Sequence, residues 1–389
     1  MFDKTRLQKP VVDRILSISD FKVAPPNDGY LITAALLAEG AISSVVTLNF
    51  DVALTTALSQ LGLGSVVGVI ERPEDLQLPH TKLVNVYYLH RNANSPDPEL
   101  WVLRTSVLEE DWRNHWEALI AVRVLTAPVV VFAGLGTPIA VLLESSRLIR
   151  EALPMPTVVY QVGPGARVGS RFALEAGVDA QHYIQLGWGE FMTELAKRLT
   201  VEFRSKLDQS LREKTEEEQL PAENSGDLVN QIMNLDFVTQ GILRAHVLLA
   251  SKPYEPASDD AFRLIGDLLL AIAMIARISA SSAVILKNGM VEFRRDHRTV
   301  ARYILASGRG HRGRAAVEAQ LRSRRQRVDE MEANGVLVAG TSEPIELPTL
   351  PKDIARGDIP FDDLIAPDTP MYHVSVIRSA PETIGDIVP

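Results

Sequence analysis

Residues 43–58 read SSVVTLNFDVALTTAL, and this stretch decides the fold that we predict. A run of β-branched residues indicates a strand, and the stretch rich in Ala and Leu after it indicates a helix. Asn49 and Asp51 lie between the two. In α/β folds the carboxyl ends of strands and the N-termini of the helices after them form the ligand crevice. The two polar residues therefore either bind a ligand or cap the helix, as Asp and Asn commonly do.

The same pattern of strand and then helix recurs from about residue 29 to residue 205. The short runs are almost entirely apolar, which is typical of a parallel sheet covered by helices on both faces. Their alternation with helical stretches predicts an α/β fold, with a Rossmann-like, doubly wound parallel sheet over residues 1–204. The predicted strands are 43–48, 65–70, 83–89, 127–134, 156–162 and 182–186.

The pattern changes beyond residue 204. Residues 205–227 are polar and highly charged, and we interpret them as a helix end followed by a linker. Long stretches with helical periodicity come next and predict a mainly α-helical domain over 228–336. Residues 337–389 are rich in proline and aspartate, with few periodic runs, and are predicted to form an extended C-terminal arm.

Composition excludes several classes of site. The chain of 389 residues has a formal net charge of −9 and no cysteine, which excludes disulfides, thiolate zinc sites and a cysteine nucleophile. Residues 268–276 are apolar, but they are far shorter than the ~20 residues of a membrane span. Residues 1–21 show no signal-peptide pattern. We therefore expect a cytoplasmic protein without membrane contact.

Further candidate positions follow other predicted strands. His90 comes directly after the third, where a histidine can act as a general base, although a structural histidine is more common. Gly134 and Gly136 lie at a strand-to-helix turn, Thr137 begins the helix, and Gly163 follows the next strand. Glycines at such places let the backbone approach a ligand, but tight turns need glycine as well. None of these positions identifies a site by itself.

Taken in order, these positions resemble the bacterial, defence-associated branch of the SIR2-like family. The resemblance covers roughly residues 28–200. The matching stretches are Thr47-Leu48-Asn49-Phe50-Asp51, Leu89-His90, Leu103-Arg104-Thr105 with Asp111-Trp112, and Gly134-Leu135-Gly136-Thr137. The motifs are moderately specific as a set, and none is specific alone.

The resemblance implies an activity. SIR2-like defence proteins bind NAD in a Rossmann-like domain and cleave its nicotinamide–ribose bond. By resemblance, Asn49 would hold the nicotinamide ribose and the attacking water, and His90 would act as the base. The residues implied in binding NAD, which is the substrate here, are Thr47, Asp51, Gly134, Gly136, Thr137 and Gly163. A deacylase of this family carries a four-cysteine zinc module, which this chain cannot build.

The chain departs from the family pattern in two ways. The GAG-type loop that wraps the NAD phosphates is not found before Thr47, and neither is the first strand that leads into it. Arg91 stands where the family has glycine, and Gly136 stands where it has serine. The shared motifs predict an NAD glycohydrolase of a bacterial defence system. The departures make a non-catalytic SIR2-like structural or regulatory subunit the alternative.

An arginine-rich stretch lies outside the resemblance. Between Glu292 and Val328 the chain carries 11 arginines, no lysine and three acids, a local charge of 11 − 3 = +8. Arginine suits phosphate or carboxylate recognition, but a solvated face or a surface that docks on an acidic subunit is the commoner use. The residues predicted to contact nucleic acid are Arg294, Arg295, Arg298, Arg312, Arg314, Arg324 and Arg325. By resemblance, we also expect a homo-oligomer or a second defence protein as partner.

Overall fold

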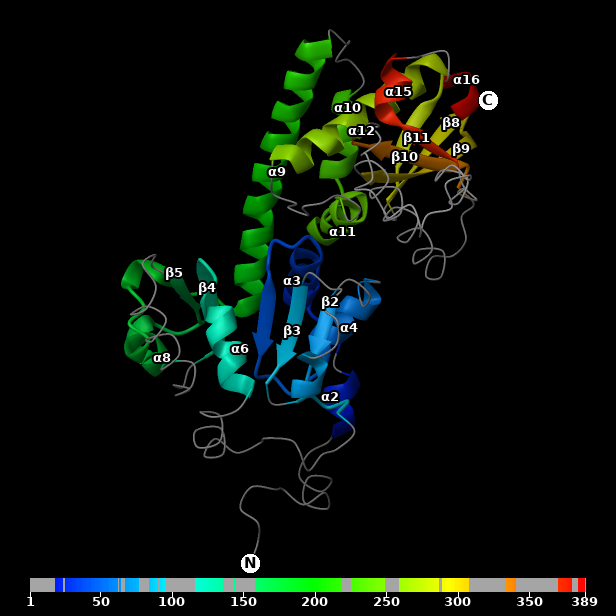
Figure 1. Ribbon diagram of the computed structural model, residues 1–389. Coiled ribbons are helices and arrows are strands. Elements are labelled where there is room, and N and C mark those ends of the chain that lie inside the picture. The colour runs from blue at the N-terminus through cyan, green and yellow to red at the C-terminus, as the bar shows by residue number, and fades with distance from the viewer. Residues whose placement is uncertain are drawn as a thin grey trace, which may run out of the picture. The chain divides into compact units, whose positions relative to one another are not determined.

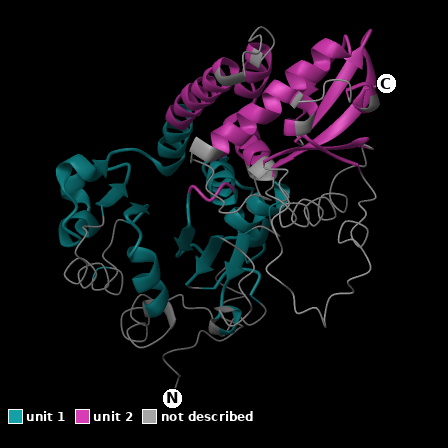
Figure 2. Cartoon of the chain, turned by 45° about the horizontal axis from the view of Figure 1, so that its top comes forward, with its two compact units in different colours: residues 1–38, 42–197 teal, residues 39–41, 198–389 magenta. Residues whose placement is uncertain are grey.

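The computed structural model describes two compact units, formed by residues 1–38 with 42–197 and by residues 39–41 with 198–389 (Figure 2). Within these ranges the described residues are 18–23, 25–61, 63, 67–76, 84–89, 91–95, 116–135, 143, 158–218, 225–248, 259–286, 289–307, 333–340, 370–379 and 384–388. Among the described helices, none is both long and apolar enough to cross a membrane.

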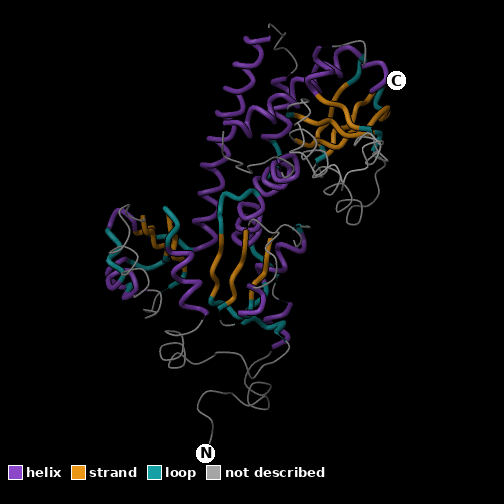
Figure 3. The backbone as a smooth tube through the Cα atoms, viewed as in Figure 1, coloured by secondary structure: helices purple, strands orange, loops and turns teal. Residues whose placement is uncertain are grey.

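The described part of unit 1 contains six strands, which lie in two three-stranded parallel sheets (Figures 1 and 3). One sheet has the order β1-β3-β2, and the other has the order β4-β5-β6. The strands are β1 (Ser44–Thr47), β2 (Val67–Ile70), β3 (Val84–Tyr88), β4 (Val129–Ala133), β5 (Val158–Val162) and β6 (Tyr183–Ile184). All six predicted strands and the α/β class with parallel strands are confirmed. The strands form two separate sheets instead of the one sheet expected.

Helices alternate with the strands of unit 1. Among the described residues they are α2 (Ile18–Val23), α3 (Asp28–Ala38), α4 (Ala53–Gln60), α6 (Trp116–Leu125), α8 (Arg171–Glu175) and the start of α9 (Trp188–Glu218), which belongs to unit 2 from residue 198 onward. The 3-10 turns are Pro73–Leu76, Arg167–Gly169 and Ala180–His182. Helix α3 is buried from Ile32 to Ala38, because its sequence is apolar on all sides. Helix α4 is amphipathic and buries Ala53, Leu54, Ala57 and Leu58.

One hydrophobic core contains residues of both sheets of unit 1. It includes Ile70 and Tyr87 from the β1-β3-β2 sheet and Val130 and Val159 from the β4-β5-β6 sheet, and it includes Phe172 of α8. Apolar runs bury both faces of a parallel strand, as β3 shows with all five residues buried. The shared core makes the two sheets parts of one packed unit.

Unit 2 is built on a five-stranded mixed sheet with the order β11-β10-β9-β8-β7. Strands β7, β8 and β9 are antiparallel neighbours, whereas β10 and β11 run parallel to β9. The elements are α10 (Ser225–Met233), α11 (Phe237–Leu248), α12 (Asp259–Ile278), β7 (Ser282–Ile285), β8 (Met290–Arg295), β9 (Arg298–Ser307), β10 (Gly335–Ala339), β11 (Met371–His373), α15 (Val374–Ser379) and α16 (Ile384–Ile387). Helices α10, α12, α15 and α16 pack with one face of the sheet in a single core.

The prediction of a mainly helical domain over 228–336 fits α10, α11 and α12 but missed the sheet that begins at residue 282. Residues 298–307 were interpreted as helix but form β9, and residues 282–285 form β7 instead of extending α12. A short apolar run fits a buried strand and a buried helix equally well by periodicity. Asp296 and His297, which both have positive φ (49° and 62°), close a two-residue hairpin between β8 and β9, and β9 is buried between its neighbours β8 and β10.

Two other predicted boundaries also differ from the structure. Helix α9 continues through Glu218, so the first part of the predicted linker 205–227 is helical. The predicted arm 337–389 contains most of β10 and all of β11, α15 and α16, and Val374, Ile377, Ile384 and Ile387 lie in the unit 2 core. The described parts of this segment are therefore integral to the fold, because they complete the sheet and bury apolar side chains against α12.

Replacing Gly335 with alanine is expected to destabilise the protein by about 1–3 kcal/mol. A Cβ atom at this buried position would lie 2.8 Å from the Pro370 carbonyl oxygen and 2.9 Å from a ring carbon of Tyr303. The matched control is Gly226→Ala in α10, where a Cβ atom would meet nothing within 4 Å. This control should be neutral or slightly stabilising, because alanine favours helix. Urea-induced unfolding checks the pair, and equal midpoints would contradict the prediction.

Candidate functional site

The carboxyl ends of β1 and β3 lie side by side, because the strands are parallel neighbours with Thr47 opposite Tyr88. The backbone N–H of Leu89 donates to the Thr47 carbonyl oxygen at 3.3 Å, and that of Ala93 donates to the Phe50 carbonyl oxygen at 2.9 Å. The segments that follow the two strands are thus held together. The structure places the TLNFD motif and the loop at 91–95 at one edge of the sheet.

Asn49 lies exposed at this edge, and its side-chain amide has a defined partner. The Asn49 Nδ2 group donates to the Tyr30 hydroxyl at 3.0 Å, and the Asn49 backbone N–H donates to Thr47 Oγ1 at 3.0 Å. Burial, and then the charge of Asp51, raise the pKa of Tyr30 above its usual value, although the Asn49 hydrogen bond opposes this. The Tyr30 hydroxyl is therefore protonated at neutral pH and orients the amide.

Asp51 contacts the start of helix α4, which was the predicted alternative to ligand binding. Its Oδ1 accepts a hydrogen bond at 2.9 Å from the backbone N–H of Ala53, the first residue of α4. A carboxylate at this place satisfies a helix N–H group and interacts favourably with the helix dipole. Thr47 likewise accepts the hydrogen bond from Asn49. Both residues shape the turn from which the Asn49 side chain projects.

A second polar cluster at the same edge was not predicted. Glu71 follows β2, and its Oε2 accepts a hydrogen bond from Ser95 Oγ at 3.0 Å, while its Oε1 accepts one from Asn92 Nδ2. Asn92 Oδ1 in turn accepts a hydrogen bond from the Asn94 backbone N–H at 2.9 Å. Asn92 and Ser95 are buried, so these contacts hold the loop after β3. The local signal was the Asn-x-x-Ser spacing in the sequence RNANS, which suits a turn closed by side chains.

Tyr88 lies beside this edge but cannot serve as a base. Burial raises its pKa to about 12, the hydrogen bond with Thr55 opposes the shift, and the charges of Asp51 and Glu71 add to it. Its hydroxyl lies 3.4 Å from Thr55 Oγ1 and is protonated at neutral pH. A base in this region would therefore have to be another group.

The predicted glycine positions are described in part. Gly134 ends β4 with a φ of 72°, a left-handed conformation that favours glycine. A Cβ atom at Gly163 would lie 2.9 Å from the Tyr183 hydroxyl, so this glycine allows the Tyr183 side chain to approach. Gln161 of β5 connects the turns that follow β4 and β5, since its Nε2 donates to the Leu135 carbonyl oxygen at 2.8 Å.

Several predicted residues lie outside the part of the chain that the structure describes. These are His90, Gly136, Thr137, Arg312, Arg314, Arg324 and Arg325. The structure brings Thr47, Asn49 and Asp51 together at one sheet edge, and it places Gly134 and Gly163 at the ends of neighbouring strands in the other sheet. No contact between these two groups is found among the described residues.

Helix α3 precedes β1, but its first turn carries Asp28, which disfavours an anion, and a Cβ atom at Gly29 would lie 2.8 Å from Trp188 Nε1. This helix start therefore does not replace the GAG-type loop. Groups of three or more histidine, aspartate or glutamate residues that could hold a metal ion are not found in the described ranges.

Comparison with known proteins leaves the identity of the chain open. No protein-family model matches it, and no curated protein matches it either. The SIR2-like resemblance therefore stays a prediction that rests on the motifs and their order.

Proposed function

We propose that unit 1 is a SIR2-like domain that cleaves the nicotinamide–ribose bond of NAD, as an effector of a bacterial defence system. The observation that carries the proposal is the exposed Asn49 amide at the carboxyl end of a parallel strand, held by Tyr30. Because Nδ2 is used by Tyr30, Oδ1 is the atom that would accept a hydrogen bond from a ribose hydroxyl or from the attacking water. Such positioning is a recognised source of rate acceleration.

The strand order supports a ligand site at this edge. The chain builds β1-β3-β2 in one sheet and β4-β5-β6 in the other, and among the described strands β1 and β4 each pair on one side only. In a Rossmann-like arrangement the order would reverse between β1 and β4, and ligands bind at such a switch point. Asn49 and Gly134 follow these two strands.

His90 is the proposed base. Its chain neighbours Leu89 and Arg91 both belong to the edge that carries Asn49. Tyr88 is protonated at neutral pH, and Asp51 is used as the α4 cap. An imidazole has a pKa near neutrality and so suits proton abstraction from the water or from a ribose hydroxyl.

Nicotinamide release from NAD by the purified full chain tests the proposal, with and without DNA. We expect turnover that falls at least about 100-fold in Asn49→Ala and in His90→Ala. The matched control is Asn94→Ala, an exposed asparagine of the same edge, which should keep wild-type activity. Tyr30→Phe should lower kcat more than it raises KM, because it frees the Asn49 amide to rotate.

The alternative function is a non-catalytic SIR2-like subunit. It is favoured by one observation, the use of Asp51 and Thr47 in local turn contacts that need no ligand. Absence of turnover under every condition, together with absence of NAD binding by calorimetry, would select this alternative. Equal loss of activity in Asn49→Ala and Asn94→Ala would also contradict a specific role for Asn49.

A further inference from the structure

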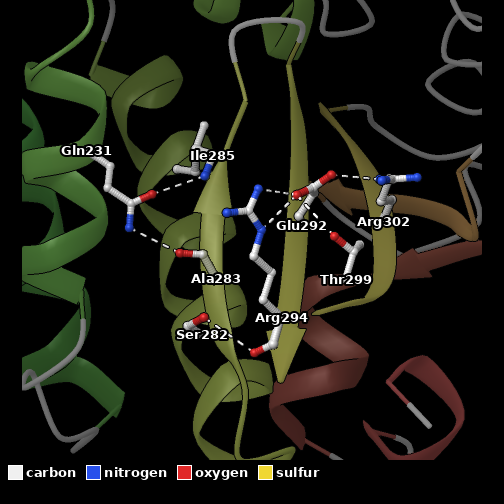
Figure 4. Close-up of polar contacts among 8 residues, drawn as sticks. All are labelled: Gln231, Ser282, Ala283, Ile285, Glu292, Arg294, Thr299 and Arg302. Carbon is white, nitrogen blue, oxygen red and sulfur yellow. Dashed lines mark hydrogen bonds and ion pairs between the residues drawn. The ribbon is translucent and has the colours of Figure 1, made fainter. Parts of the chain in front are cut away.

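The β8–β9 hairpin of unit 2 presents two different faces. Side chains alternate along a strand, so Val291 and Phe293 of β8 point into the core that contains α12. Glu292 and Arg294 point to the opposite face, and Arg302 of β9 stands directly across from Glu292. Figure 4 shows the three side chains together on this face. The sheet therefore carries charged groups on the face opposite the core that contains α12.

Glu292 is the centre of this cluster. Its Oε1 accepts a hydrogen bond from Arg302 Nε at 2.7 Å, and its Oε2 accepts one from Arg294 Nε at 2.9 Å (Figure 4). Arg294 Nη2 and Thr299 Oγ1 also donate to Oε2. Burial raises the pKa of the Glu292 carboxyl, but the hydrogen bonds and charges of Arg302 and Arg294 outweigh it, so the pKa lies below its usual value. Glu292 is thus ionised at neutral pH.

The two arginines are oriented by the carboxylate and still reach solvent. Glu292 is 3% exposed, whereas the side chains of Arg294 and Arg302 are 38% and 30% exposed. Arg302 uses Nε on Glu292, and Arg294 uses Nε and Nη2. The remaining guanidinium N–H groups are those farther from the carboxylate. Two fixed forks of this kind suit the oxygens of a phosphate.

Charge favours a polyanion as the ligand. Two guanidinium groups share one carboxylate, so the cluster keeps a charge of +1. The whole hairpin, residues 290–307, carries four arginines against two acids, 4 − 2 = +2. Arg298 is exposed and lies opposite Arg295 at the hairpin turn, so alternation places this pair on the other face of the hairpin. A single cross-strand Arg–Glu pair would be enough to fix the hairpin register. Fixing the register therefore does not require the second arginine of the cluster or the seven arginines within residues 309–327.

We propose that Arg294 and Arg302, held by Glu292, form a binding site for phosphate groups of a nucleic-acid backbone. Glu292 is the positioning residue of this site. The ligand is a phosphodiester chain and not a single phosphate, because arginine recurs along the hairpin and in the sequence after it. The proposal concerns unit 2 and does not rest on NAD cleavage in unit 1.

Fluorescence anisotropy with a labelled single-stranded DNA and the matching duplex tests the proposal on the full chain. We expect the double variant Arg294→Gln/Arg302→Gln to bind about tenfold more weakly and to lower the slope of log K against log salt by about 2. The matched control is Arg171→Gln/Arg204→Gln, which removes the same charge from two exposed ion pairs. This control should retain most of the affinity and of the slope.

Glu292→Gln separates a built site from a merely positive surface. The substitution removes one negative charge and so raises the net charge of the cluster by +1. A surface that acts only by charge would then bind DNA more tightly. A site that needs oriented guanidinium groups would bind more weakly, which is the result we expect. Tighter binding would overturn the proposal. Circular dichroism of each variant checks the fold. The single variant Arg302→Gln, which keeps the contacts of Arg294 with Glu292, serves if the other variants do not fold and should lower the slope by about 1.

Competition identifies the ligand class. Displacement of DNA by a second oligonucleotide, but not by millimolar inorganic phosphate or by polyglutamate, supports the proposal. Equal displacement by phosphate would assign the site to a free phosphate, and equal displacement by polyglutamate would assign it to an acidic protein. Either result, or no DNA binding at low salt, would overturn the nucleic-acid proposal. NAD hydrolysis of the variants should be unchanged, so the two proposals can fail separately.

Discussion

Replacing Glu39 with alanine is expected to destabilise unit 2 by about 3–5 kcal/mol. Glu39 is 1% exposed, and its carboxylate accepts a hydrogen bond at 2.8 Å from Nη2 of Arg244, which is also buried. The Arg244 guanidinium lies 4.0 Å from the centre of the Phe203 ring. Removal of the carboxylate would leave a buried cation that, among the described contacts, keeps the Phe203 ring. An uncompensated buried charge costs far more than the intact pair contributes to stability.

Urea-induced unfolding of the full chain measures this effect. The matched control is Glu194→Ala, which removes an exposed carboxylate that lies 3.8 Å from Lys197 and should change the free energy of unfolding by less than about 1 kcal/mol. The double variant Glu39→Leu/Arg244→Met should recover most of the loss, because apolar residues of similar volume can replace a buried pair. A similar small change in Glu39→Ala and Glu194→Ala would show that water reaches the Arg244 side chain.

Replacing Phe172 with alanine is expected to destabilise unit 1 by about 3–5 kcal/mol. Phe172 of α8 is fully buried, and its ring packs edge-on against Phe132 of β4 with centroids 4.8 Å apart. The core around it also contains Tyr87 and Leu89, which belong to the segment that leads to the Asn49 edge. A cavity in this place would therefore weaken both sheets, because tightly packed interiors relax only partly around a lost side chain.

Amide hydrogen exchange, read strand by strand, measures this prediction. Protection should fall in β3 as well as in β4 and β5, since one core contains residues of all three. The matched control is Val168→Ala, in which the residue is 79% exposed and its truncation should have little effect. Loss of protection restricted to β4 and β5 would mean that the two sheets unfold independently. The proposed site between β1 and β4 would then lack a common core.

Local sequence patterns were sufficient for the strands of unit 1. Short β-branched runs with helical stretches between them predicted all six strands, because a strand buried on both faces needs an almost continuous apolar run. Asp51 was assigned to the start of α4, where a carboxylate is favourable whatever the rest of the fold does. These features depend on neighbours within a few residues, which the sequence contains directly.

The same kind of pattern failed in unit 2. The run RTVARYILAS fits a buried helix and a buried strand, and the structure makes it β9 between β8 and β10. The two-residue turn at Asp296 and His297 lacks the glycine that usually marks such hairpins. Only the burial of β9 between neighbouring strands decides its conformation, so a local pattern could not predict it.

The sequence by itself determined which residues stand at the strand ends, including Asn49 and Asp51. Only the tertiary structure decided their partners: Tyr30 for Asn49, Asn92 for Glu71, and two arginines for Glu292. These pairs join segments whose proximity depends on strand order, on register and on the hairpin turn. A hydrogen bond or an ion pair requires atoms within about 3–4 Å, and local periodicity does not place distant segments at that distance.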